Sequence, residues 1–101
     1  MIRGTTPTLT FTFSGITLAD MEDIYVTIKP GTVKLDKVKD DMILDTDKNT
    51  ASVKLTQEET LEFKSNTKAY VQVRIKTANG IAAAGNIMQM DVDPILKEGV
   101  I

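Results

Sequence analysis

The segment 69–77, Ala-Tyr-Val-Gln-Val-Arg-Ile-Lys-Thr, alternates apolar and polar side chains over its whole length. A period of two is that of a β-strand buried on one face, so the odd-numbered residues should face a core and the even-numbered ones should face away from it. Asn79-Gly80 follows, and both residue types tolerate the positive φ of a tight hairpin turn. We therefore predict a central strand over 69–77, with the chain from Ile81 returning antiparallel beside it.

Other short apolar segments are expected to form the strands around this one. Turn residues separate them: Ser14-Gly15, Pro30-Gly31 and the polar run 45–49. The expected strands are 8–13, 24–29, 32–37, 42–44 and 50–55, with Leu9, Phe11, Phe13, Ile24, Val26, Ile28, Val33, Leu35, Val53 and Leu55 toward the core.

Helical structure is expected only in short connections. Thr56-Gln57-Glu58-Glu59 matches a capping box, which predicts one or two helical turns anchored by Leu61 and Phe63. A single turn is also compatible with residues 17–23.

The register of the last strand, 87–92, stays open from the sequence. Met88, Met90 and Val92 share one face, Ile87 points the other way, and Gly85 is where a bulge could exchange the faces.

Six or seven short strands, with one helical turn between the fifth and sixth, are typical of an antiparallel β-sandwich of immunoglobulin-like type. A small barrel, or a five-stranded sheet with one helix, would also fit this pattern. A length of 101 residues suits one domain over 1–101, in which residues 93–101 form an apolar C-terminal tail.

Composition bears on the class of partner. The net charge is −2 with both signs interspersed, which argues against a nucleic-acid or anionic-membrane surface, although four lysines gather in segment 29–39. There is no secretory h-region and no apolar run long enough for a membrane span, so we expect a soluble chain that is not exported.

The sequence does not predict an enzyme, because it contains no histidine and no cysteine. We expect no catalytic residue and no cofactor. Asp45, Asp47 and Asn49 resemble the opening of a calcium loop, but Thr50 and Thr56 stand where the loop needs glycine and glutamate, so a solvated turn is the favoured interpretation and no metal is expected.

Two features predict contacts with other proteins. One is the outer face of the central strand, where tyrosine and arginine are residue types favoured at interface centres; a tyrosine covered by its own loop is the alternative. The other is the apolar C-terminal region, which either packs on its own domain or is buried against a neighbour. The candidate interface residues are Tyr70, Gln72, Arg74, Met88, Met90, Ile95, Leu96, Val100 and Ile101.

Residues 1–8, the strand that follows them, residues 53–61 and the strand phrase 71–74 resemble a family of small prophage-encoded proteins. These proteins are similar in layout to the N-terminal β-domain of tailed-phage upper baseplate proteins. The resemblance implies a structural role in a phage tail or related particle, assembled in the host cytoplasm and carried in the virion. It transfers no functional residue, and we expect no coiled-coil or receptor-binding segment within residues 1–101.

The leading hypothesis is therefore a non-enzymatic virion or assembly component that binds copies of itself or a neighbouring tail protein. The alternative is a small phage-encoded inhibitor or adaptor that binds one host protein through an acidic patch around Asp40–Asp47.

Overall fold

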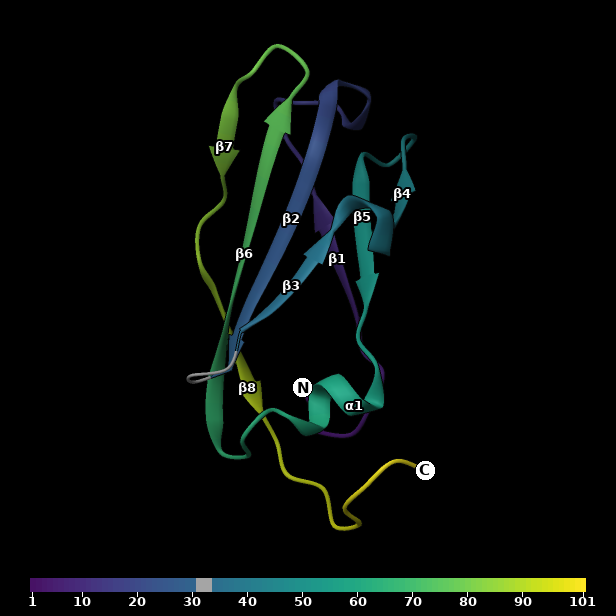
Figure 1. The fold of residues 1–101 in the computed structure, drawn as a ribbon, viewed down its shortest axis with the longest axis vertical. Coiled ribbons are helices and arrows are strands. Elements are labelled where there is room, and N and C mark those ends of the chain that lie inside the picture. Colours follow the sequence, from purple (N-terminus) through teal and green to yellow (C-terminus); the bar gives the residue numbers. More distant parts are fainter. Residues whose placement is uncertain (31–33) are drawn as a thin grey trace.

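A computed structural model describes residues 1–30 and 34–101 and shows two antiparallel sheets packed face to face (Figure 1). The first sheet has the order β1 (Thr8–Thr12), β5 (Thr50–Lys54), β4 (Met42–Asp45). The second has the order β3 (Leu35–Val38), β2 (Met21–Pro30), β6 (Thr67–Thr77), and both β7 (Ala82–Ala84) and β8 (Met88–Val92) pair with β6. The helical segments are α1 (Gln57–Leu61), η1 (Leu18–Asp20) and η2 (Lys39–Asp41).

This strand order confirms the immunoglobulin-like sandwich. If β1 to β6 stand for strands B, C, C′, D, E and F, and β7 with β8 for strand G, the sheets read B-E-D and C′-C-F-G, as in immunoglobulin domains. The described residues form eight strands rather than the six or seven expected, because the last strand is divided in two. The helical turn α1 lies between β5 and β6, as predicted.

The core lies between the sheets and follows the predicted alternation. Odd-numbered residues of β6 from Ala69 to Thr77 are buried, as are Ile24, Val26 and Ile28 of β2. Each of the larger apolar side chains stabilises the fold by about 1.5–3 kcal/mol through removal of its surface from water. The pairing of β2 with β6 runs from Met21 opposite Thr77 to Pro30 opposite Ala69 and is the most extensive strand pairing among the described residues.

A one-residue insertion separates β7 from β8. In β7, Ala84 lies opposite Arg74, whereas in β8 Met88 lies opposite Val71, so four steps along one strand match three along β6. The shift turns Met88, Met90 and Val92 toward the core face of the sheet, and Val92 is only 1% exposed. The bulge that Gly85 suggested is therefore present, and it decides the register that the sequence left open.

The helix α1 closes the lower end of the sandwich in Figure 1. Its predicted capping box is formed: Thr56 Oγ1 accepts from the Glu59 N–H at 3.1 Å, and Glu59 Oε1 accepts from the Thr56 N–H at 2.8 Å. Buried Thr60 donates to the Thr5 carbonyl at 2.9 Å, which ties α1 to the N-terminal segment. Phe63 is buried as expected, whereas Leu61 is half-buried.

Of two expected turns, one is longer than predicted and the other lies partly outside the described residues. The β6–β7 connection is a four-residue loop, 78–81, rather than a two-residue turn, and Gly80 supplies its positive φ of 89°. Gly31 and Val33, on which the expected turn and returning strand of the β2–β3 hairpin partly depend, lie outside the described residues. The described part of that hairpin pairs as predicted, with Leu35 opposite Ile28.

Candidate protein-binding surfaces

The outer face of the five-stranded sheet carries the first group of predicted residues. Tyr70 and Arg74 both point away from the core on β6, and Tyr70 is 44% exposed. Register places Tyr25, which is 46% exposed, opposite Arg74, and Lys29 opposite Tyr70. Two half-exposed tyrosines and a guanidinium therefore share one face of a continuous sheet. The sequence analysis did not propose Tyr25. The alternation of 24–29 already indicated that its side chain faces outward, because it lies between the inward residues Ile24 and Val26.

Gln72 has a structural role on the same face. Its Nε2 donates to the carbonyl of Gly85 at 3.1 Å, across the point where β7 passes into β8. Gly85 in turn donates its N–H to the Val73 carbonyl at 2.9 Å. The half-buried Gln72 side chain thus holds the bulge against β6, and it is less available to a partner than the neighbouring tyrosine.

The outer face carries several exposed basic side chains, although the register also places Asp23 opposite Lys76. Lys29, Arg74 and Lys76 are exposed and form no ion pair within the described residues. Asp36 of β3 is engaged instead: the hydroxyl of Thr27 donates to its carboxylate at 2.8 Å, and Lys34 lies 3.3 Å away. The Thr27 hydrogen bond, followed by Lys34, lowers the pKa of Asp36 despite the opposing effect of desolvation.

Met88 and Met90, the second predicted group, lie on the inner face of β8 and not beside Tyr70. Met90 is half-buried, whereas Met88 is 47% exposed at the rim of a groove between the two sheets. The groove holds about 520 Å³. It is lined by β1, β6 and the β7–β8 segment, and sequence alternation alone could not show that these segments meet there.

The C-terminal tail, the third group, is pinned to the lower end of the domain. Arg3 donates to the carbonyls of Phe63 at 2.6 Å and Leu61 at 2.9 Å, and its guanidinium pairs with Glu98 at 2.8 Å. Gln57 exchanges two hydrogen bonds with the backbone of Ile101. The tail therefore contacts its own domain, which is one of the two alternatives that the sequence left open.

The apolar side chains of this tail differ in exposure. Ile95 is half-buried, and its δ1 methyl group lies next to the position that a Cβ on Gly4 would occupy. Leu96 and Ile101 remain almost fully exposed, and Val100 is about half exposed. The tail thus presents a small apolar surface at the lower end of the molecule in Figure 1.

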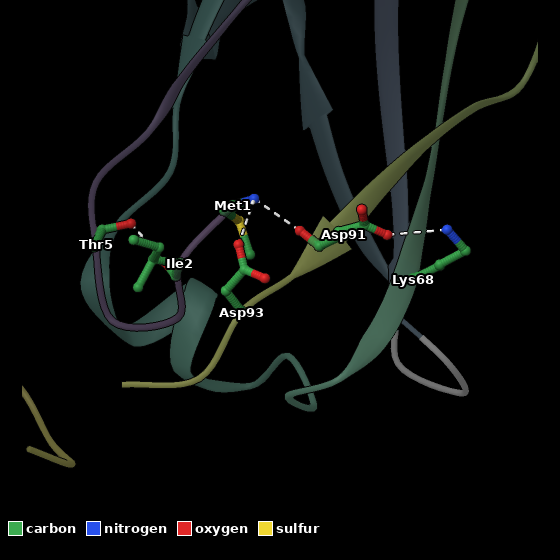
Figure 2. Close-up of polar contacts among 6 residues, drawn as sticks. All are labelled: Met1, Ile2, Thr5, Lys68, Asp91 and Asp93. Atoms are coloured by element: carbon green, nitrogen blue, oxygen red, sulfur yellow. Dashed lines mark hydrogen bonds and ion pairs between the residues drawn. The ribbon is translucent and has the colours of Figure 1, made fainter. Parts of the chain in front are cut away.

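Figure 2 shows how the N-terminal residues join β8 near this end. The amine of Met1 donates to the Asp91 carbonyl at 2.7 Å, and Ile2 forms a parallel bridge with Asp93. Lys68 pairs with the Asp91 carboxylate at 2.9 Å, and this contact raises the pKa of Lys68 and lowers that of Asp91. Both partners are solvent-exposed, so water screens the pair.

Asn49, in the turn 45–49 that the sequence predicts to be solvated, has a structural role in the fold. Asn49 has a φ of 56°, and its side-chain oxygen accepts from the Leu18 N–H at 2.9 Å. Its Nδ2 donates to the carbonyls of Phe13 and Ile16. Asn49 therefore fastens the loop after β1, and both its side-chain and its main-chain oxygen accept hydrogen bonds. Within residues 1–30 and 34–101, no three acidic side chains come together as a metal site.

The acidic stretch Asp40–Asp47 is also partly engaged. Asp41 accepts from the Val38 N–H at 3.0 Å, and Asp45 accepts from the Lys48 N–H at 3.1 Å. Asp40 and Asp47 are exposed.

In the described chain, no helix has the length and apolar character needed to cross a membrane. Comparison with models of known protein families and with curated protein sequences gave no match.

Proposed function

We propose that this chain is a non-enzymatic structural component of a phage tail or baseplate that acts through protein contacts. The resemblance of residues 1–8, 53–61 and 71–74 to small prophage-encoded proteins supports the particle assignment. One structural observation supports the contact surface: exposed Tyr25 and Tyr70 lie with Arg74 on the outer face of the five-stranded sheet.

This face has the physical properties of a binding surface. A tyrosine contributes a large, rigid contact area at low cost in conformational entropy, and an arginine adds directed hydrogen bonds. Both tyrosines stand on strands that pair along nearly their whole length, so the face is already ordered before a partner arrives. A partner would therefore meet a preorganised surface.

The charge of the face indicates the chemistry of the partner. Lys29, Arg74 and Lys76 favour an acidic surface, since opposite charges steer encounter and fix the orientation of a complex. Asp40 and Asp47 of another copy offer such charges, as could a neighbouring tail protein. Assembly in the host cytoplasm followed by incorporation in the particle is part of this proposal.

Light scattering tests the proposal by measuring the mass of the chain over a concentration series, alone and mixed with each protein encoded beside it. We expect a complex with itself or with one of these neighbours. The combined variant Y25S/Y70S/R74S should abolish it, because the substitutions remove contact area while leaving the buried face of each strand intact.

The matched control is T10A/K54S, which alters exposed residues on the other sheet and should leave the complex unchanged. A chain that stays monomeric in every mixture contradicts the proposal and favours an adaptor for a single host protein. A complex that survives the triple variant contradicts the assignment of the outer face.

A further inference from the structure

The groove beside Met88 has walls without charge. Its lining comes from β1, from Val73 and Ile75 of β6, and from the start of the β7–β8 segment. Segment 81–87 reads Ile-Ala-Ala-Ala-Gly-Asn-Ile, and segment 8–14 across the groove also contains no charged residue. Phe11 and Phe13 provide the aromatic part of the lining. The groove is therefore suited to apolar side chains.

The rims of this groove are two strand edges. The N–H of Thr77 donates to the Ile81 carbonyl and that of Gly85 to the Val73 carbonyl, so by the alternation of antiparallel pairing Ala82 and Ala84 direct their backbone groups away from β6. On β1, the N–H of Phe13 donates to the Asn49 carbonyl and that of Leu55 to the Pro7 carbonyl. By the same alternation, the backbone groups of Thr8, Thr10 and Thr12 point away from β5. In the described chain no strand pairs with either edge.

Immunoglobulin-type sandwiches place strand A next to strand B at this side of the fold. Here β1 has the position of strand B, and the described residues place only β5 beside it. Near the other end of the molecule, Ile2 bridges Asp93, so the N-terminal segment covers that part of the β8 edge but not β7. The upper part of the same side is the open groove.

We propose that the β7 edge receives an extended segment of another protein as an added strand, with apolar and acidic side chains alternating along it. Apolar side chains would enter the groove toward Phe11 and Phe13. The outward ones would lie beside Ala82 and Ala84, the outer-face partners of Lys76 and Arg74. Because alanine is short, these two cations can extend over β7 to reach carboxylates on the added strand.

Charge favours such a partner over a second copy joined edge to edge. Pairing β7 with β7 of another copy would bring Arg74 and Lys76 of each chain close to the same residues of the other, and like charges repel. An acidic segment has no such cost. The inferred site uses the edge of the sheet and does not depend on the outer-face tyrosines of the proposed function.

Fluorescence anisotropy of the intact chain tests this site with a short labelled peptide in which valine and glutamate alternate. A peptide with lysine in place of glutamate is the charge control. We expect the glutamate peptide to bind and the lysine peptide not to bind. R74E/K76E should weaken binding of the glutamate peptide by about tenfold or more, since two attractions become repulsions. K29E/K54E changes the net charge equally at exposed positions away from β7 and should not.

Proline substitution identifies the edge. A84P removes an N–H that faces outward from β7, so pairing with β6 persists while strand addition is blocked. T10P makes the matched change on β1. The proposal predicts loss of binding in A84P and its retention in T10P. Binding that is lost only in T10P, or that is insensitive to R74E/K76E, overturns it, as does no binding by the glutamate peptide. Self-association of the chain that A84P abolishes would also overturn it, because the occupant would then be a second copy.

The charge variant keeps the test decisive if A84P fails to fold, because its substitutions are on exposed side chains. The two proposals share Arg74 but fail separately: Y25S/Y70S leaves Arg74, Lys76 and the β7 backbone edge in place, whereas A84P leaves Arg74 and both tyrosines in place.

Discussion

The two edges of the five-stranded sheet, β3 and β7, are built in opposite ways. On β3, Lys37 occupies an inward-facing position opposite buried Val26, and its Nζ lies 2.6 Å from the Glu59 carboxylate. An inward charge on an edge strand discourages pairing with another chain. The β7 edge has no charge, and only its short length and the following bulge limit it. The β3 edge is therefore protected against pairing with another chain by an inward ion pair, whereas the β7 edge beside the apolar groove has no such protection.

Deletion of Gly85 should have the largest effect, because it removes the extra residue that sets the register of β8. Buried Val92 would then turn toward solvent with Met90, at a cost of about 3–5 kcal/mol in unfolding free energy. Urea denaturation measures this loss.

The matched control for this deletion is G85A. A Cβ at this position would meet the Val73 carbonyl at 3.9 Å, which is an ordinary contact, so the substitution should change stability little. A deletion variant as stable as the parent would show that the bulge does not fix the register.

Substitution of Glu59 removes the ion pair at the β3 edge. E59A removes both the capping hydrogen bond to the Thr56 N–H and the ion pair with Lys37, and we expect a loss of about 1–2 kcal/mol in unfolding free energy. E59Q keeps an acceptor for Thr56 but loses the charge, so its loss should be smaller. Equal losses in the two variants would mean that the cap contributes nothing.

Acid pH should weaken the same contact gradually. Burial raises the pKa of Glu59, but hydrogen bonds from Lys37 and the Thr56 backbone outweigh burial and lower it overall. A carboxyl with a lowered folded-state pKa stabilises the fold above its unfolded-state pKa, and this contribution is lost as pH falls through the folded-state value. Denaturation at a series of pH values should show a steeper acid loss in the parent than in E59Q. Parallel curves would contradict the prediction.

The smallest effect is expected for K68A on the open side of the sheet. Lys68 and Asp91 pair across β6 and β8, and both are exposed, so water screens the attraction. We expect no measurable change in the denaturation midpoint. A loss as large as that of E59A would show that this surface pair, and not only the Lys37–Glu59 pair, supports the sheet.

Local patterns predicted most of the fold. The alternation in 69–77, the capping box at Thr56 and the inward faces of β1, β2 and β5 are properties of neighbouring residues, so the sequence shows them directly. The division of the last strand was harder, because a bulge depends on how the strand meets β6. Gly85 marked its place but not its direction.

The candidate surfaces were less predictable, because they depend on residues far apart in the chain. The nine predicted interface residues fall into three separate places: the outer face of the sheet, the inner face of β8 and the tail. Arg3 lies ninety-five positions from Glu98, so no local sequence pattern could predict their pairing. The groove likewise requires β1 and β7 to meet at one side of the sandwich, which only the sheet order reveals.

The most direct test of the contrast between the two edges is an NMR titration of the intact chain with the alternating valine and glutamate peptide, following backbone amide shifts. Our account predicts shifts in residues 82–86 and 8–14 and none in β3, and it predicts that K37L, which removes the inward charge, adds shifts in β3. Shifts confined to β3 in the parent chain, or none at β7, would contradict it.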